Sequence, residues 1–510
     1  MNGLTPRRII VAILSLALIA VALWQLRSAE QGITATRMTI GDIPATAYQL
    51  PGGGKAPAVV IAHGFAGSQQ LMKSFALSFA RNGYLAITFD FAGHGRNPQG
   101  MSGDVNLIEG ATRRLLEDVT KVAAKARTLG DGRIAVLGHS MASDIIVRFA
   151  ESDPSVVATI AVSMFSPAVT AFAPRNLLMI DGEWEGTLKT EALRNVGLVS
   201  APEPPQAGVT YGDFGAGTAR RAAFSPHAEH ASVLFNEVTM RESLAWLDES
   251  FGVTRQATPE IDSRGPWIVA LLGGVVMLGW PLSSLLPRIQ PLPMGAGLQW
   301  RRMWPGVLIP AVATPLLLRF VPTHFLPVLV GDYLAVHFFL YGLITCALLV
   351  WQGSWSKGEQ AQQTAPASFL FALLAVVGYG FVGIVWPLDS FVTSFVPVGS
   401  RPMLVAVLFL GTLPYFLSDE WLTRGRGAAR GAYAVTKVAF IISLAIAVEL
   451  DPERLFFLII IIPVVVPFFI VYGLLSRWSY AKTGHPLVAA VASALAFAWA
   501  IGVTFPLVTG

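Results

Sequence analysis

Long apolar runs fill the second half of this 510-residue sequence and constrain its fold more than any other feature. A run of about 20 apolar residues matches the length of a helix that crosses a bilayer. Prolines inside such runs would break helices in water but are tolerated in membrane bundles. The second half therefore predicts an all-α polytopic transmembrane bundle. Eight runs alternate with short basic or polar loops, at approximately 266–286, 303–321, 326–351, 367–388, 402–418, 432–450, 455–475 and 487–507.

Another apolar run lies near the start of the chain. Arg7 and Arg8 precede an uncharged stretch from Ile9 to Leu26, which is long enough to span a bilayer core. It is either a signal anchor or a cleaved signal peptide. Because residues 25–29 contain no clear small-x-small cleavage site, we favour an uncleaved transmembrane signal anchor over residues 1–29. With the eight later runs, this makes nine spans.

Most charged residues lie between these apolar regions, although only 13% of the chain is charged and 53% is hydrophobic. Strand-like and helix-like segments alternate over residues 30–253, which is typical of a doubly wound, mostly parallel α/β sheet. A polar stretch at 254–265 separates this part from the apolar runs. We therefore predict an α/β domain over 30–253, a linker over 254–265 and a transmembrane domain of about eight helices over 266–510.

One stretch of the α/β part carries a catalytic signature. A β-favouring segment at 133–137 leads into the turn Gly-His-Ser-Met-Ala at 138–142, and a helix-compatible segment at 143–151 follows at once. The order strand, sharp turn and helix is that of a nucleophile elbow, which exposes the serine Oγ, here of Ser140, at the edge of the sheet. Small residues suit both ends of the turn because strand and helix backbones approach each other there.

Two glycine-rich turns follow buried strands upstream of the elbow. They are His63-Gly64-Phe65, after a strand at 56–62, and Asp-x-x-Gly-His-Gly at 90–95. Together with the elbow, these segments resemble the α/β-hydrolase superfamily, in particular serine aminopeptidase-like and lipase-like hydrolases, over about residues 37–252. Ala142 departs from the usual glycine. The resemblance implies a serine hydrolase whose oxyanion hole is formed by the backbone N–H groups of Phe65 and Met141, and a structural role for His94.

The same resemblance implies a triad acid just beyond the strand predicted at 176–180. Glu185 fits the offset best, and Asp181 is the main alternative acid. Glu183 and an acid elsewhere, such as Asp213, stay open. A carboxylate is needed at this position because it fixes the imidazole tautomer and stabilises the imidazolium.

The triad histidine is implied on a loop before the last helix of the domain, predicted at 238–251. His227 and His230 compete for this role, and the short run of small and apolar residues after His230 favours it. Ser140, Glu185 and His230 then follow the chain order of an α/β-hydrolase triad. In such a triad the histidine removes the serine proton before the hydroxyl attacks the substrate.

Basic residues between the apolar runs indicate the membrane orientation. If the α/β domain lies on the extracytoplasmic side, only Arg401 and Arg454 fall in short external loops. That asymmetry obeys the positive-inside rule. It predicts a multi-pass cell-membrane protein whose α/β domain is periplasmic or extracellular. The cytoplasmic segments then hold eleven basic residues, namely Arg7, Arg8, Arg288, Arg301, Arg302, Lys357, Arg424, Arg426, Arg430, Arg477 and Lys482.

Polar residues inside the apolar runs are also candidates, because burying charge in hydrocarbon is costly. Asp332 and His337 share the run 326–351, and Arg319 lies near the end of the preceding one. The three either form a cleft that delivers a lipid head group or acyl ester to Ser140, or Arg319 simply pairs with Asp332. Snorkelling to the interface is the third possibility.

Composition excludes several other classes of function. The net charge is +4, but the basic residues form no patch interleaved with aromatics, so no nucleic-acid partner is expected. Cys346 is the single cysteine, which rules out an intrachain disulfide and a thiolate cluster. With no glycine-rich phosphate loop and no metal-ligand motif, we expect no cofactor and no metal.

These features lead to one expected function and two alternatives. We expect a membrane-anchored serine hydrolase that acts on acyl esters or thioesters, small or lipid-linked, with the lipid bilayer as its other partner; a peptidase stays open. The first alternative is a multi-pass transporter or channel with a hydrolase-like regulatory or binding domain. The second is a scaffold with an inactive triad.

Overall fold

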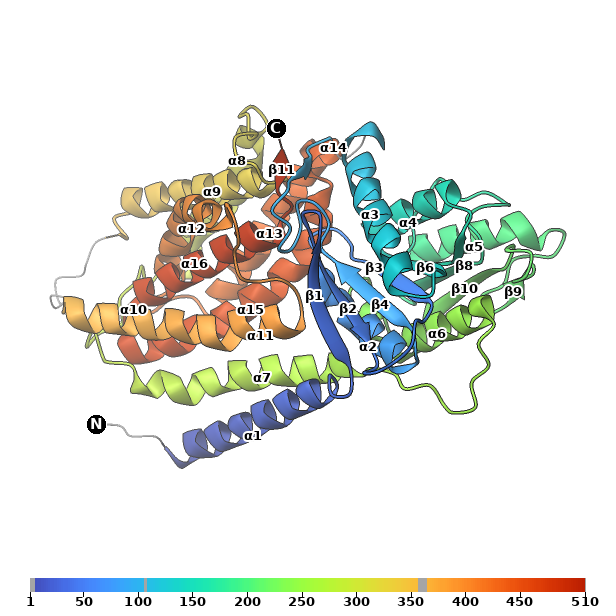
Figure 1. Ribbon diagram of the computed structural model, residues 1–510. Coiled ribbons are helices and arrows are strands. Elements are labelled where there is room, and N and C mark those ends of the chain that lie inside the picture. Colours follow the sequence, from blue (N-terminus) through green and yellow to red (C-terminus); the bar gives the residue numbers. More distant parts are fainter. Residues whose placement is uncertain (1–4, 105–107, 356–364, 510) are drawn as a thin grey trace. The chain divides into compact units, whose positions relative to one another are not determined.

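The computed structural model describes residues 5–104, 108–355 and 365–509, so that Lys357 lies outside the described residues. The chain folds into two compact units (Figure 1). An α/β unit comprises Val21–Ala270 and two short later segments, Leu388–Ser394 and Pro506–Gly510. The rest of the chain forms a helical unit.

The α/β unit is built on one nine-stranded sheet in the order β1-β2-β4-β3-β6-β7-β8-β10-β9. Neighbours from β4 through β10 are parallel, whereas β1, β2 and β9 run antiparallel to their neighbours. This confirms the predicted doubly wound, mostly parallel α/β class. The strands are β1 (Thr34–Ile40), β2 (Ile43–Gln49), β3 (Ala58–Ala62), β4 (Leu85–Phe89), β6 (Ile134–His139), β7 (Val156–Val162), β8 (Leu177–Gly182), β9 (Thr210–Tyr211) and β10 (Arg220–Ser225).

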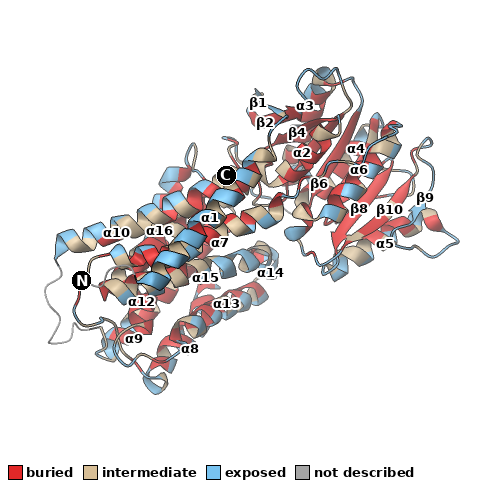
Figure 2. Ribbon diagram, turned by 90° about the horizontal axis from the view of Figure 1, so that it is seen from below, coloured by how far each residue is buried: buried red, intermediate tan, exposed pale blue. Residues whose placement is uncertain are grey.

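Alternation along the buried strands supplies a core on each face of the sheet, because successive side chains of a strand point to opposite faces. Val59 and Ile61 of β3 pack with α2 and α6, whereas Val60 and Ala62 pack with α3 and α4. Figure 2 shows these central strands as buried. The helices of the unit are α2 (Lys73–Arg81), α3 (Arg113–Leu129), α4 (Met141–Ser152), α5 (Gly186–Ser200) and α6 (Glu237–Phe251), with short helical turns at Gln69–Met72, Ile108–Thr112 and Ser232–Phe235.

Several elements differ from the sequence prediction. The hairpin β1–β2 at the edge of the sheet was not predicted, and neither were the last strands, β9 and β10. The strand expected at 176–180 runs on to Gly182, so Asp181 lies inside β8 rather than in the loop after it. The elbow helix begins directly at Met141 instead of at 143.

The two later segments of the α/β unit come from the part of the sequence assigned to the transmembrane domain. The first, 388–394, includes the end of α11 (Trp386–Phe391). The second ends in β11 (Val508–Thr509), which pairs in parallel with β5 (Met101–Ser102) as a two-stranded sheet. The α/β unit is therefore completed by chain that follows it by more than a hundred residues.

The helical unit contains the long apolar helices. Among the described residues, eight helices are long and apolar enough to cross a membrane. The ninth predicted run, α8, is not among them, because its 19 residues include Pro305, Pro310 and Pro315 and two arginines near the start, which lower its apolar character. The long helices, two of which begin or end in the α/β unit, are α1 (Pro6–Ser28), α7 (Arg264–Leu282), α8 (Trp300–Leu318), α9 (Gly331–Trp351), α10 (Pro366–Gly380), α12 (Arg401–Thr423), α13 (Ala432–Leu450), α15 (Phe457–Thr483) and α16 (Pro486–Thr504), with short turns at Ser283–Leu285, Phe381–Val385 and α14 (Pro452–Leu455).

Candidate active site

The turn between β6 and α4 is sharp and strained. Ser140 has φ 54° and ψ −120°, a conformation that side chains other than glycine rarely adopt. A Cβ on Gly138 would lie 2.6 Å from the carbonyl oxygen of Ala142, which explains why small residues stand at both ends of the turn. The strain holds Ser140 at the carboxyl end of the parallel strands, as in a nucleophile elbow.

His230 lies beside this serine. Its Nε2 is 2.8 Å from Ser140 Oγ, and its Nδ1 is 2.6 Å from Glu185 Oε1. The consistent assignment is that Ser140 Oγ–H donates to Nε2 and Nδ1–H donates to the carboxylate. A serine, a base and an orienting acid are thus linked in one hydrogen-bonded chain, and sequence analysis had named all three residues.

The Glu185 carboxylate is held in an ionised state. Its Oε2 accepts hydrogen bonds from Gly182 N–H at 2.6 Å and Ser163 Oγ at 2.9 Å. Burial raises the pKa of Glu185, but the hydrogen bonds from His230 and Gly182 outweigh it, and the pKa is lowered from its ordinary value. Glu185 therefore presents a negative charge to the His230 ring at neutral pH.

Asp181, the alternative acid, is not hydrogen-bonded to His230. It is fully buried in β8, where one carboxylate oxygen accepts from Met164 N–H at 2.8 Å and the other has no partner. Burial raises its pKa to about 7. A carboxyl group that is neutral below pH 7, and that accepts one hydrogen bond from a backbone N–H, suits a structural role.

The other rival residues also lie apart from Ser140. Glu183 accepts a hydrogen bond from His227 N–H at 2.8 Å, and the His227 side chain is exposed. Asp213 caps its own loop through Ala216 N–H at 2.7 Å. The geometry thus favours Glu185 and His230 over each of these alternatives.

Two buried histidines that sequence analysis did not single out as site residues support the site. His139 Nε2 is 2.9 Å from the His230 carbonyl oxygen, and burial lowers the pKa of His139 to about 3. His63 Nε2 accepts from Phe91 N–H at 3.2 Å while its Nδ1 lies 2.8 Å from Gly64 O. Both rings are therefore neutral, and their hydrogen bonds fix the loops around Ser140. Their position within the turns at 63–65 and 138–142 was the available signal.

The predicted oxyanion-hole residues lie on the two turns nearest the nucleophile. Met141 is the first residue of α4, where a backbone N–H has no intrahelical acceptor. A Cβ on Gly64 would lie 3.0 Å from Ser140 Cβ, so the His63-Gly64-Phe65 turn passes directly against the elbow. This proximity suits the expected roles of Phe65 and Met141, which stay a prediction.

The polar residues named in the apolar runs are not brought together. Among the described residues no ion pair joins Arg319 to Asp332: Arg319 is exposed, and the Asp332 carboxylate accepts from Phe325 N–H at 3.1 Å and Tyr333 N–H at 2.8 Å. His337 is buried, with its Nε2 3.0 Å from Ser443 Oγ. Of the three alternatives, the Arg319–Asp332 pair is therefore wrong, because backbone donors around the start of α9 already satisfy the carboxylate.

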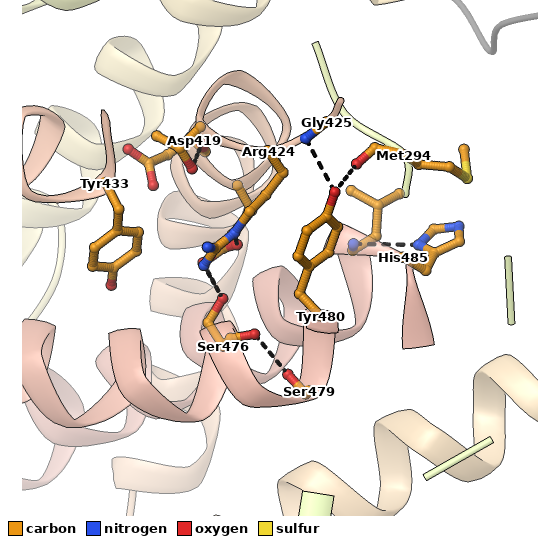
Figure 3. A network of polar contacts seen from close by, with 12 residues as sticks. Met294, Asp419, Arg424, Gly425, Tyr433, Ser476, Ser479, Tyr480 and His485 are labelled. Carbon is orange, nitrogen blue, oxygen red and sulfur yellow. Dashed lines mark hydrogen bonds and ion pairs between the residues drawn. The ribbon is translucent and has the colours of Figure 1, made fainter. Parts of the chain in front are cut away.

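A different set of charges is buried in the helical unit (Figure 3). Arg424 donates to Glu420 at 3.0 Å and to Ser476 Oγ at 2.8 Å, and Ser476 Oγ donates to Glu420 at 2.6 Å. Asp419, the residue before Glu420, pairs with Lys437 of α13, and both side chains are buried. Sequence analysis counted Arg424 as a loop residue and did not name the pairs.

Comparisons with known proteins identify a family model and several similar structures. A family model described as the alpha/beta hydrolase fold matches residues 57–259, and no curated protein sequence matches the chain. Similar solved structures include one described as a predicted CIB-like hydrolase from Thermoplasma acidophilum (12% identity, covering 42% of this chain and 97% of that one, TM-score 0.33). Others are an epoxide hydrolase from Vigna radiata (19%, covering 27% and 40%, TM-score 0.22) and a membrane phospholipase A described as a bacterial virulence factor (15%, covering 47% and 93%, TM-score 0.31). Residues 57–259, with their mostly parallel sheet, have the α/β-hydrolase fold.

Proposed function

We propose that this protein is a membrane-anchored serine hydrolase that cleaves or transfers acyl groups of esters or thioesters through an acyl-Ser140 intermediate. The observation that carries the proposal is the chain Ser140 Oγ to His230 Nε2 at 2.8 Å and His230 Nδ1 to Glu185 Oε1 at 2.6 Å. Nucleophile, base and orienting acid within hydrogen-bond reach are the requirement for covalent acyl transfer.

Each group then has a defined task. His230 Nε2 takes the Ser140 Oγ proton as the oxygen bonds to the substrate carbonyl carbon. The carbonyl oxygen gains a negative charge and accepts hydrogen bonds from the N–H groups of Phe65 and Met141. When the tetrahedral carbon releases the alcohol or thiol, His230 returns the proton to the leaving group. A water or another alcohol repeats the sequence and frees Ser140.

Apolar side chains around the site favour an acyl substrate over a charged one. Phe165 is 60% exposed and follows β7, where its N–H bonds Ser143 Oγ, which in turn donates to Ser140 O. Trp184, 66% exposed, directly precedes Glu185. Large exposed apolar groups beside Glu185 and beside the loop bonded to Ser143 supply contact surface for an acyl chain.

The membrane assignment of the proposal rests on the apolar helices of the chain. The basic residues between them favour an extracytoplasmic α/β unit by the positive-inside rule. A hydrolase held at the bilayer surface meets lipid-linked acyl groups at high local concentration, which favours lipid or lipid-like esters as its substrates.

A fluorophosphonate probe, which reacts with activated serines, tests the proposal on the full-length protein in detergent. We expect the wild type to be labelled and to hydrolyse p-nitrophenyl esters, and Ser140→Ala to lose both properties. Ser155→Ala, an exposed serine remote from the triad, is the matched control. A folded wild type that is never labelled would overturn the proposal. Esters of graded chain length then define the acyl preference.

A further inference from the structure

The loop that carries the expected oxyanion donor is held by a distant part of the chain. Ser68, three residues after Phe65, is fully buried. Its Oγ lies 2.9 Å from Thr393 Oγ1 and accepts a hydrogen bond from Ser394 N–H at 2.8 Å. Both partners belong to the segment 388–394 of the α/β unit.

Two further contacts tie the same segment to the neighbouring turns. Ser394 Oγ donates to Gln70 Oε1 at 2.9 Å, and Arg96 pairs with Asp389 at 2.7 Å. The two sides of this clamp are themselves linked, because Asp90 accepts from Gln69 N–H at 2.8 Å and from Arg96 N–H at 3.1 Å. The segment therefore contacts the turn after β3 and the turn after β4 at once.

The loop that Ser68 anchors also contacts the nucleophile. Between Ser68 and the elbow lies the turn at Gly64, which packs against Ser140 and His139 so closely that a Cβ would meet them at about 3 Å. Ala66 in this loop has φ 55°, a conformation that needs support from its surroundings. A shift of the loop by a fraction of an ångström would move an N–H donor out of reach of a developing oxyanion.

We propose that Thr393 and Ser394 are positioning residues for the oxyanion loop and act through Ser68. The inference rests on the proposed acyl-transfer function. It assigns the segment 388–394 a role in catalysis although it touches no reacting atom. The hydrolase site is then complete only when this later segment of the chain is in place.

Thr393→Val removes the hydroxyl that contacts Ser68 and keeps the side-chain shape. We expect kcat for p-nitrophenyl esters to fall about tenfold with KM nearly unchanged, less than the 10²–10³-fold loss for a deleted oxyanion donor. Thr393→Ser, which keeps the hydroxyl, should recover activity to within about twofold. Thr190→Val, whose exposed hydroxyl bonds only its own helix, is the matched control and should equal wild type.

A double-mutant cycle with Ser68→Ala isolates the contact. If Thr393 acts through Ser68, the double variant should lose no more activity than Ser68→Ala alone. Unchanged kcat in folded Thr393→Val, or fully additive losses, would overturn the positioning role while the wild type still reacts with the fluorophosphonate. A wild type that never reacts overturns the proposed function, and the positioning role falls with it. The two failures are therefore distinguishable.

Discussion

Asp181 and Glu185 are two carboxyl groups four residues apart whose surroundings push their pKa values in opposite directions. Glu185 has three hydrogen-bond donors, from His230, Gly182 and Ser163, and its pKa is lowered. Asp181 has one, from Met164, and burial raises its pKa to about 7. Only the ionised group can stabilise an imidazolium, which is why Glu185 suits the triad and Asp181 does not.

Asp181 makes stability depend on pH. An unfolded aspartate titrates near pKa 3.9, so between about pH 4 and pH 7 the folded protein holds a proton that the unfolded chain has lost. The contribution of Asp181 to the free energy of unfolding is therefore fully present below pH 4. It falls by up to about 4 kcal/mol as the pH rises toward 7. Asp181→Asn keeps the acceptor for Met164 N–H and abolishes the titration. Calorimetry in detergent should show the variant gaining stability over wild type as pH rises; a constant difference between pH 4 and 7 would contradict this.

Glu185→Gln tests the assignment of the acid by activity. Glutamine retains an acceptor for His230 Nδ1–H but no charge, so kcat should fall by about 10²–10⁴. Asp181→Asn and Glu183→Gln serve as controls, because neither carboxylate is hydrogen-bonded to His230, and both should stay within about twofold of wild type. Steady-state hydrolysis of a soluble ester measures all three. If Glu183→Gln, and not Glu185→Gln, abolished turnover, the acid would be misassigned.

At the scale of elements, local patterns predicted the strands that carry the site but not the edges of the sheet. The elbow was readable because its turn needs small residues at Gly138 and Ala142 and because the strand before it is buried. The hairpin β1–β2 was not predicted because β1 is largely exposed and the two strands contain Thr, Ala and Pro among few large apolar residues. Segment 388–394 could not be predicted, since its place depends on contacts with residues about 300 positions earlier.

The buried Lys437–Asp419 pair of the helical unit could not be predicted for the same reason, since it joins α13 to α12. Lys437 and Asp419 lie 18 residues apart and no local pattern links them. A buried carboxylate deprived of its partner is costly. We therefore treat the pair as a stabilising contact between α12 and α13.

Lys437→Met should destabilise the helical unit by about 3–5 kcal/mol, because it leaves the Asp419 carboxylate buried without a cation. The double variant Lys437→Met/Asp419→Asn removes both charges and should recover most of the loss. Arg302→Met, an exposed charge on α8, is the control and should cost little. Thermal unfolding in detergent measures each effect. A single Lys437→Met variant as stable as wild type would show that Asp419 has another way to be neutralised.

At the scale of the whole molecule, the apolar helix α1 ends inside the folded α/β unit, which begins at Val21. Ala22 and Leu26 at its end are fully buried, and Glu30 just after it pairs with Lys73. Arg81 donates to the Ala29 carbonyl oxygen at 2.5 Å. Removing residues 1–29 would delete the buried Ala22 and Leu26 and the Ala29 acceptor of Arg81, so the protein purified from membranes should keep its N-terminal helix. Intact mass spectrometry decides this, and a mature chain starting near residue 30 would contradict it.

Hydrogen bonds within the helical unit sort its loops into two ends. The loop after α7 bonds the chain after α12 through Gly297 N–H to Arg424 O, and the chain after α15 through Met294 N–H to Gly484 O. At the other end, Arg454, after α13, donates to Thr323, after α8. The 19-residue α8 thus runs from one end of the unit to the other, and at about 1.5 Å per residue its length matches a bilayer core. We therefore expect α8 to be a span despite its low apolar character.

Whether α8 crosses the membrane determines the predicted orientation of the whole chain. If α8 did not cross, every later loop would change sides, and the basic residues around Arg426, Arg430 and Lys482 would face the side opposite to Arg288. If it does cross, they share one side, which the positive-inside rule identifies as cytoplasmic. Arg424 and Arg401 carry little weight here because both side chains are buried and bonded inside the unit. Without Arg424 and Arg401, the loops on one side of the membrane still carry a strong excess of basic residues.

Single cysteines in a Cys346→Ala background test this topology with a membrane-impermeant maleimide on intact cells. Gly54→Cys in the α/β unit and Phe320→Cys after α8 are both exposed positions and should be labelled from outside. Pro293→Cys, in the loop between α7 and α8, should be labelled only after the membrane is opened. Because Phe320 and Pro293 flank α8, labelling of both from the same side would show that α8 does not span. Labelling of Pro293→Cys but not Gly54→Cys on intact cells would instead place the α/β unit, and with it Ser140, in the cytoplasm.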